Sequence, residues 1–341
     1  MRLLYLFLLF YISVSSAMEY VYPVACLDDG TILYIHQQTP THIELFQWNT
    51  ITNQYTPLLW SLFNPAGLQL LPNQLGFSFI DNGRLRIKAF QKRSPKAVEF
   101  DEPIYNINGL QWIDDHTCYC SAQQGDYFSL FELSDNGDVN CLTCAEDKDY
   151  MYPQKIDDSL FYIERTRDQN HIFNYRIIQS LYSNQSPSTI IDFQDKPIIF
   201  LHMITEKEGF VLEHAQNIED SAQTIQFFYH QIINEKGVWK RESLFTFFIP
   251  TNLVGSGNER IYESLLPLLP RPEKERIYFV DCSSTYWLKP YYYNTTTHTI
   301  EKIKVPNKKG HYFVPWLCKS TLYCGGTKDS AIQNSFISLL T

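Results

Sequence analysis

The chain has 341 residues, of which 44% are hydrophobic, 15% aromatic and 19% charged. This amount of apolar material supports a large packed core and excludes a disordered or fibrous protein. The 28 basic and 37 acidic side chains give a formal net charge of −9, so a surface that neutralises nucleic-acid phosphates is not expected.

The N-terminal segment, residues 1–17, is typical of a secretory signal peptide. Arg2 precedes the apolar run Leu3 to Val14, and small residues follow, ahead of the expected cleavage site. The run is shorter than the roughly 20 apolar residues of a membrane-spanning helix, which disfavours an uncleaved anchor. We therefore expect a secreted, periplasmic or envelope protein with no membrane insertion after cleavage, and a single domain over residues 18–341.

Short runs of β-branched and aromatic residues, separated by turn residues, predict strands along the whole chain. Aligned with one another, the runs form a repeat of roughly 40 to 50 residues, which is the length range of propeller blades. The first two units share a four-strand pattern. Their expected strands cover 23–27, 31–36, 43–48 and 54–59, and then 67–71, 75–80, 85–90 and 97–100.

The third unit, about 106 to 144, shows the pattern most clearly. Its Gly-Leu-Gln start at residues 109–111 matches the start of the second unit at 67–69. Tight turns such as Asp135-Asn-Gly-Asp138 join the runs, which predicts an antiparallel meander. The expected strands of the third and fourth units cover 109–115, 117–122, 127–133 and 139–143, and then 152–158, 160–165, 172–178 and 188–193.

The later units are longer and less regular. Strands are expected over 209–213 and 225–229 in the fifth unit, 276–280 and 291–294 in the sixth, and 312–317, 321–324 and 335–340 in the seventh. One small meander cannot bury both its faces, but a ring of them can, because each sheet packs on the next. The fold class expected is therefore an all-β propeller of four-stranded antiparallel blades. We expect seven blades, with six as the alternative and a β-sandwich as a further possibility.

Several segments resemble the repeat of TolB-type propellers, which also occurs in dipeptidyl-peptidase-type enzymes. The similar residues are Trp112-Ile-Asp-Asp115, Ser121-Ala122, Leu130-Phe-Glu-Leu133 and Leu142-Thr143. The resemblance covers about two units and departs from the usual pattern, because the Ser-Pro-Asp-Gly hairpin is absent. It implies a propeller without a hydrolase domain, since no Gly-x-Ser-x-Gly nucleophile elbow is present. By analogy, it implies a role in envelope protein assemblies.

No catalytic residue, metal ligand or cofactor site is predicted, because the nine histidines are scattered and no phosphate-binding loop occurs. The predicted strands leave two groups of candidates for binding or catalysis. Four aspartates at strand ends, Asp28, Asp114, Asp157 and Asp281, are the candidate carboxylates of an alternative function, a propeller-type carbohydrate-active hydrolase. The aromatic side chains of Tyr286, Trp287 and Tyr292 are candidates for a surface that stacks on sugars or anchors a partner.

The eight cysteines permit disulfides in an exported chain. Equivalent positions in neighbouring blades of a closed ring predict the bonds Cys26–Cys318 and Cys282–Cys324. Cys141 and Cys144 have zinc or redox spacing, but Cys118 and Cys120 lie two strands away, about 9 to 10 Å at normal sheet spacing, which disfavours a zinc site.

The leading functional hypothesis is an exported binding or scaffold module. An unknown protein or glycan partner would meet its loop face or its central channel. The module is expected to be a monomer, and enzyme activity is left open. A third hypothesis is a purely structural envelope component that its acidic surface keeps soluble.

Overall fold

The computed structural model describes residues 19–39, 42–61, 64–81, 84–101, 104–144, 146–169, 172–181, 187–215, 223–254, 268–283, 287–305, 310–319, 321–328 and 337–339. Almost all of the regular structure in them is antiparallel strand, and none of their helices is long and apolar enough to cross a bilayer. The predicted signal peptide, residues 1–17, lies outside this part of the chain. Two compact units are present, residues 63–303 and residues 1–62 with 304–341.

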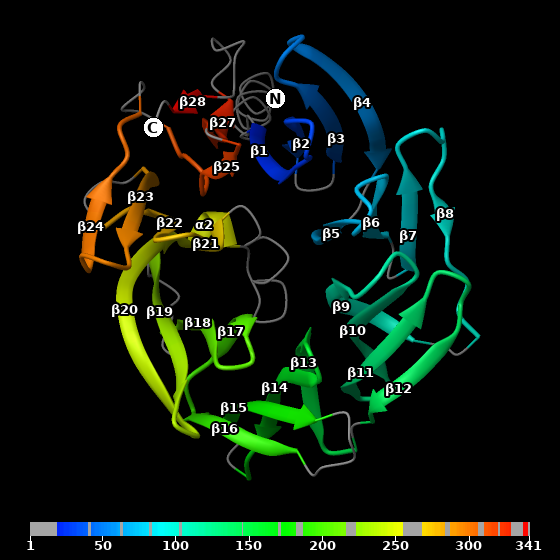
Figure 1. The fold of residues 1–341 in the computed structure, drawn as a ribbon, viewed down its shortest axis with the longest axis vertical. Coiled ribbons are helices and arrows are strands. Elements are labelled where there is room, and N and C mark those ends of the chain that lie inside the picture. The colour runs from blue at the N-terminus through cyan, green and yellow to red at the C-terminus, as the bar shows by residue number, and fades with distance from the viewer. Residues whose placement is uncertain are drawn as a thin grey trace, which may run out of the picture. The chain divides into compact units, whose positions relative to one another are not determined.

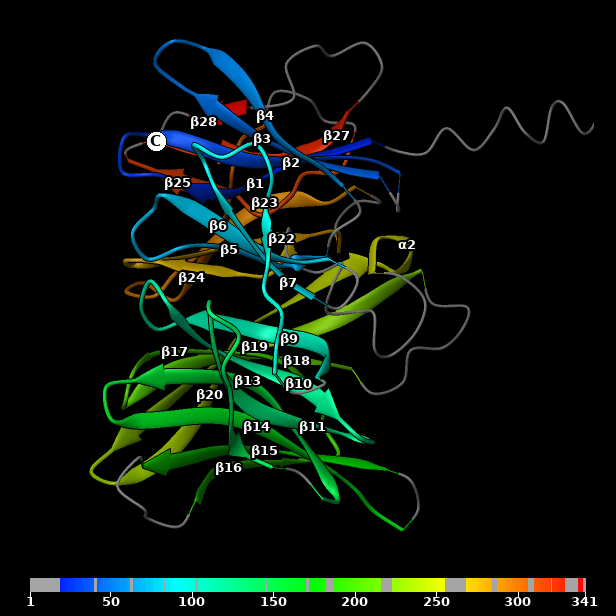
Figure 2. The ribbon, with the colours of Figure 1, turned by 90° about the vertical axis from the view of Figure 1, so that its right-hand side faces the viewer.

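Residues 63–303 form five four-stranded antiparallel sheets, each with its strands paired in chain order (Figure 1). Figure 2 shows one of them, with β13, β14, β15 and β16 side by side in that order. The strands are β5 (Asn64–Leu70), β6 (Gly76–Asp81), β7 (Arg84–Ala89), β8 (Lys96–Ala97), β9 (Tyr105–Trp112), β10 (Thr117–Gln124), β11 (Tyr127–Ser134), β12 (Val139–Thr143), β13 (Lys148–Ile156), β14 (Ser159–Arg167), β15 (Phe173–Leu181), β16 (Ser188–Gln194), β17 (Ile198–Thr205), β18 (Glu208–His214), β19 (Thr224–Glu235), β20 (Val238–Pro250), β21 (Arg271–Glu273), β22 (Arg276–Asp281), β23 (Lys289–Asn294) and β24 (Thr299–Lys302). The short helix α2 (Thr251–Val254) follows β20.

Strand β10 shows why the strands are apolar on both sides. Cys118 and Cys120 belong to a buried cluster shared with the preceding sheet, β5–β8. Tyr119, on the opposite side of the strand, packs in a cluster with Tyr150 and Tyr162 of the following sheet, β13–β16. Because successive side chains point to opposite faces, a strand buried on both faces has no polar face. Each of these sheets is therefore a blade that packs on its neighbours along the chain.

Two glutamines on the first strands of their blades bind the backbone of the next blade. The Gln111 side chain accepts a bond from the Lys155 N–H at 2.7 Å and lies 3.5 Å from the Lys155 carbonyl oxygen. Gln154 accepts from the Met203 N–H at 2.6 Å and donates to the Leu201 carbonyl at 2.7 Å. A primary amide offers both a donor and an acceptor, so it can join the next strand much as a neighbouring peptide group would.

The same contact occurs one blade earlier, where the Gln69 side chain donates to the Leu110 carbonyl of β9. This explains the Gly-Leu-Gln triplet shared by residues 67–69 and 109–111, since the glutamine has the same role in both blades. The repeat seen in the sequence is thus in part a repeat of the contacts between blades.

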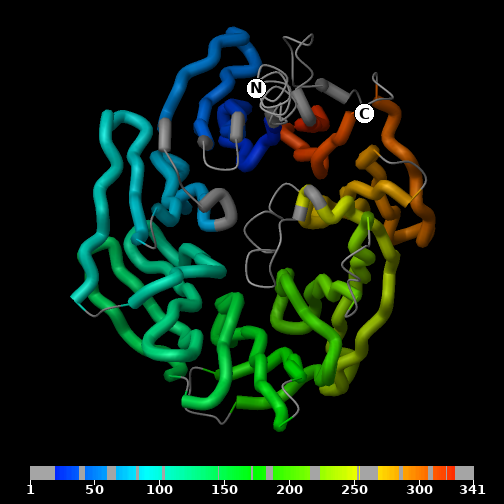
Figure 3. The backbone as a smooth tube through the Cα atoms, turned by 180° about the vertical axis from the view of Figure 1, so that it is seen from behind, coloured from blue at the N-terminus to red at the C-terminus, as the bar shows by residue number. Residues whose placement is uncertain are grey.

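The other unit contains a five-stranded sheet in the order β27-β1-β2-β3-β4 and a three-stranded sheet of β25, β26 and β28. Its strands are β1 (Glu19–Cys26), β2 (Thr31–Thr39), β3 (His42–Asn49), β4 (Gln54–Ser61), β25 (Trp316–Cys318), β26 (Thr321–Cys324), β27 (Gly326–Lys328) and β28 (Ile337–Leu339). Figure 3 shows the N-terminal strands of this unit, in blue, beside its C-terminal strands, in red.

The all-β propeller with four-stranded antiparallel blades is confirmed, but seven such blades are not. Among the described residues six sheets have four or more strands, which agrees with the six-blade alternative, and the last strands form only a three-stranded sheet. The reason is that β27 pairs with β1, with Val21 opposite Gly326. A Cβ on Gly325 would lie 2.1 Å from the Val21 carbonyl oxygen, so only glycine allows this close approach.

Candidate interaction surface at the turns of the blades

The candidate site lies at one edge of the blades formed by residues 63–303. At this edge a turn connects the first strand of a blade to the second, and another turn connects the third strand to the fourth. We call it the turn face and define it by residues 71–75, 113–116, 134–138 and 157–158. Asp114, Asp115, Asp157 and Asp158 are exposed there. These residues form turns because Asp, Asn and Gly bind the local backbone and tolerate its unusual dihedral angles, as Asp157 does with a φ of 49°.

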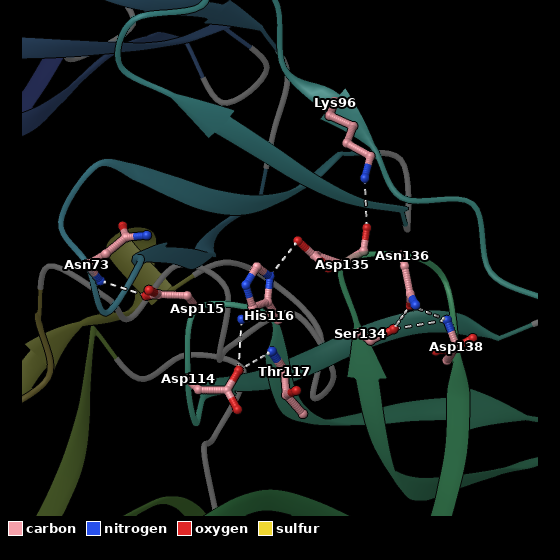
Figure 4. Close-up of polar contacts among 10 residues, drawn as sticks. All are labelled: Asn73, Lys96, Asp114, Asp115, His116, Thr117, Ser134, Asp135, Asn136 and Asp138. Carbon is pink, nitrogen blue, oxygen red and sulfur yellow. Dashed lines mark hydrogen bonds and ion pairs between the residues drawn. The ribbon is translucent and has the colours of Figure 1, made fainter.

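Asp114 organises the turn between β9 and β10. One carboxylate oxygen accepts the backbone N–H of His116 at 2.8 Å and that of Thr117 at 2.7 Å (Figure 4). These hydrogen bonds stabilise the charged form, and they lower the pKa of Asp114 below its ordinary value. The Asp114 side chain is therefore a turn cap that stays ionised and faces solvent.

His116 bridges this turn and the turn between β11 and β12. Its Nδ1 lies 3.1 Å from the Asp135 carboxylate, and its carbonyl accepts the Asp135 N–H at 2.9 Å. The hydrogen bond with Asp135, followed by the negative charge of that carboxylate, raises the pKa of His116 above its ordinary value. The imidazole is 77% exposed, so solvent and partners can reach it.

The neighbouring blade is joined to the same turns. The Asp115 carboxylate accepts the Asn73 N–H at 3.0 Å, and the Lys96 ammonium donates to the Asp135 carbonyl at 2.9 Å. Within the β11–β12 turn, the Asp138 N–H donates to the Ser134 hydroxyl at 3.1 Å. Figure 4 shows these contacts, which join the turns of two neighbouring blades.

The groups on this surface are charged or polar. The exposed aspartates of the turn face supply negative charge, and His116 supplies a donor whose charge depends on pH. In the described part of the chain no group of three or more His, Cys, Asp or Glu side chains is arranged to hold a metal ion. Exposed carboxylates and a protonated imidazole are groups that form charge-assisted hydrogen bonds.

The four candidate carboxylates of the hydrolase alternative belong to four different sheets. Asp114 and Asp157 lie in exposed turns of neighbouring blades, and Asp28 is exposed in the β1–β2 turn of the other unit. Asp281 is buried and accepts the N–H groups of Phe248, at 2.7 Å, and Ser283, at 3.2 Å. A turn-capping role accounts for Asp114 and a backbone-binding role accounts for Asp281, and neither role supports the hydrolase alternative.

The candidate aromatic surface is described only in part. Tyr286 lies outside the described residues, and Trp287 is half-buried. The Tyr292 hydroxyl donates to Glu301, and the Arg276 guanidinium lies 4.7 Å from the centre of its ring. One face of this ring is therefore covered by a cation, which leaves less of it for stacking on a sugar.

Of the two predicted disulfides, one is formed. Cys26 and Cys318 are bonded, with their Cα atoms 5.6 Å apart. Cys282 and Cys324 are buried and belong to no disulfide, so the predicted bond between them is not formed. The Cys324 sulfur instead lies 3.0 Å from the Phe313 carbonyl oxygen, within its own unit.

The remaining cysteines of the third blade also divide into two kinds. Cys118 and Cys120 are buried free thiols on β10. Cys141 and Cys144 form a disulfide with each other, and their Cα atoms lie 6.0 Å apart. The Cys-x-x-Cys motif of this blade therefore forms a disulfide.

Sequence reasoning missed the pairing of His116 with Asp135. The two residues are 19 apart in the chain, and each seemed to be an isolated turn residue. In the structure Thr117 of β10 pairs with Ser134 of β11. His116, which precedes Thr117, and Asp135, which follows Ser134, therefore lie side by side. Working out the strand register of this hairpin, from Tyr119 to Leu133, would have indicated the contact between His116 and Asp135.

No family profile and no curated protein matches the sequence. Among solved structures, a puromycin-hydrolysing peptidase from Mycobacterium tuberculosis matches with a TM-score of 0.63 at 11% identity, over 91% of this chain and 49% of that one. The propeller domain of the Trilobed protease from Pyrococcus furiosus matches with a TM-score of 0.57 at 8% identity, over 95% of this chain and 98% of that one. TolB from Acinetobacter baumannii matches with a TM-score of 0.46 at 9% identity, over 85% of this chain and 66% of that one.

The blades and these likenesses together define a β-propeller protein. The match to the propeller domain of the Trilobed protease confirms, at the level of the fold, the predicted resemblance to propellers of the peptidase type. The chain spans about half the length of the M. tuberculosis peptidase. At such low identity the likeness concerns the fold alone, and the activity of a propeller depends on the site that its loops carry.

Proposed function

We propose that this protein is an exported binding and scaffold module that holds a protein partner on its turn face. The observation that carries the proposal is the group of exposed carboxylates, Asp114, Asp115, Asp157 and Asp158, on adjacent blades of one rigid scaffold. Ligand-binding residues are commonly carried on loops that a rigid fold positions. The partner surface expected is a segment rich in lysine and arginine.

Three further observations support export and a protein partner. Disulfides such as Cys26–Cys318 are typical of oxidising compartments, which include the periplasm and the extracellular space. A glycan is less favoured, because the ring of Tyr292 is covered by Arg276 and its hydroxyl is engaged by Glu301. Propellers joined to proteases, such as the Pyrococcus domain, give a precedent for this fold beside other protein modules.

The test begins with the purified chain and cross-linking mass spectrometry on the exported proteins of the source cells. Affinity for the recovered partner is then compared between the wild type and a variant carrying Asp114→Asn, Asp115→Asn, Asp157→Asn and Asp158→Asn. We expect binding at least about tenfold weaker, and less dependent on salt, because complementary charge is removed.

Asparagine keeps the oxygen that caps the Asp114 turn, so the variant is expected to remain folded. Asp126→Asn is the matched control, since Asp126 is an exposed aspartate in the turn at the opposite end of the β10–β11 hairpin. Equal affinity of the wild type and the fourfold variant would contradict the proposal, as would cross-links confined to other surfaces.

A further inference from the structure

The disulfide between Cys141 and Cys144 holds no two elements of the fold together. Cys141 lies on β12, and Cys144 follows the last residue of this strand. β12 is the end strand of its sheet, so one of its edges has no strand partner within that sheet. Because the bond closes a loop of only three residues, it removes little freedom from the unfolded chain, and reducing it costs the fold little.

The two cysteines of this bond differ in exposure. Cys144 is exposed to solvent. Cys141 is half-buried, opposite Phe131 in the sheet, and packs against the apolar cluster shared with the blade β5–β8. A thiol in solution therefore meets Cys144 as the exposed residue of the pair, whereas Cys141 is held in place by its packing in the blade.

None of the other described cysteines combines a short disulfide loop with exposure to solvent. Cys26–Cys318 joins residues 292 apart, and Cys318 is buried. The four described cysteines outside the disulfides, Cys118, Cys120, Cys282 and Cys324, are all buried. Burial raises the pKa of the Cys282 thiol to about 12, so the reactive thiolate is scarce there.

We propose that Cys141–Cys144 is a thiol–disulfide exchange site whose substrates are low-molecular-weight thiols. A thiolate attacks the Sγ of Cys144, the bond to Cys141 breaks, and Cys141 leaves as a thiolate that takes a proton from water. A second thiolate attacks the outer sulfur of the mixed disulfide and releases the oxidised reductant together with the Cys144 thiolate. Two thiols are thereby oxidised to one disulfide while the protein bond is reduced to two thiols.

The wild-type protein provides the first test. The purified oxidised chain is equilibrated with graded dithiothreitol under native conditions, quenched with acid, alkylated and analysed by peptide mass spectrometry. We expect Cys141 and Cys144 to become alkylated at a reductant concentration at least about ten times lower than Cys26 and Cys318. Reduction of both bonds at the same concentration, or of Cys26–Cys318 first, would overturn the proposal.

Single variants test the direction of attack. In Cys141→Ser the remaining Cys144 thiol is expected to react with iodoacetamide at least about ten times faster than the remaining Cys141 thiol does in Cys144→Ser. Equal rates, or a faster Cys141, would contradict the assigned point of attack. Circular dichroism establishes that each variant is folded, and the wild-type titration decides the proposal if either variant fails to fold.

Discussion

At the scale of single residues, His116 and Asp135 illustrate how the pKa of a side chain in one turn is changed by a residue in another turn. The contact of 3.1 Å raises the pKa of His116 above 6.5. A raised pKa in the folded state contributes stability that is fully present below pH 6.5 and is lost as the pH rises through the folded value. The imidazole is highly exposed, so this contribution is screened by solvent and is expected to be small.

The prediction at this scale concerns the titration of His116. In Asp135→Asn the pKa of His116 is expected to fall toward 6.5, because both the hydrogen bond to a carboxylate and its charge are removed. The pKa is measured from the NMR shifts of the imidazole protons as the pH is varied. Asp138→Asn, which removes one exposed charge from the same turn, is the control and is expected to change the pKa less. An unchanged pKa in Asp135→Asn would show that the contact is not formed in solution.

At the scale of elements, the contacts between first strands are made by side-chain amides as well as by apolar packing. Gln154 satisfies the Met203 N–H and the Leu201 carbonyl, which belong to β17 of the next blade. β13 is irregular here, with a shift of register between Met151 and Gln154. A shift of this kind re-aims a side chain out of its own sheet, and here the glutamine reaches the neighbouring blade.

Gln154→Ala is therefore expected to lower the free energy of unfolding by about 1 to 3 kcal/mol, because backbone groups of two buried residues, Leu201 and Met203, lose their partner. The measurement is the midpoint and slope of urea unfolding followed by tryptophan fluorescence. Gln91→Ala, at an exposed position of the β7–β8 connection, is the control and is expected to change stability by less than about 0.5 kcal/mol. Equal destabilisation by the two variants would argue against a role of Gln154 between the blades.

At the scale of the whole molecule, the Cys26–Cys318 bond joins two segments of one unit that are 292 residues apart in the chain. Around it, Ile32 and Tyr323 form a buried cluster with Cys318, and Trp48 packs against them. Closing so long a loop removes much of the freedom of the unfolded chain, so the bond is placed where a covalent link stabilises most.

The double variant Cys26→Ser with Cys318→Ser is expected to lower the stability of the protein by about 2 to 5 kcal/mol. Urea unfolding measures this as an earlier midpoint. The double variant Cys141→Ser with Cys144→Ser is the matched control and is expected to lose less, since its loop spans three residues. A larger loss in the control would contradict the account based on loop length.

The sequence by itself determined the fold class and most of the strands. In the third blade the predicted runs 117–122, 127–133 and 139–143 lie within the observed β10, β11 and β12. Such local agreement is possible because strand and turn preferences depend on neighbouring residues. The bond between Cys26 and Cys318 was also predicted, since the repeat gives both residues equivalent positions in their blades.

Only the tertiary structure decided the features that depend on pairing between distant segments. The addition of β27 to β1 follows from a close backbone approach at Gly325, which no local pattern reveals. The candidate site likewise depends on a register that brings His116 to Asp135. Local sequence specifies which residues form strands and turns, whereas strand partners and side-chain contacts are selected by packing, to which residues far apart in the chain contribute together.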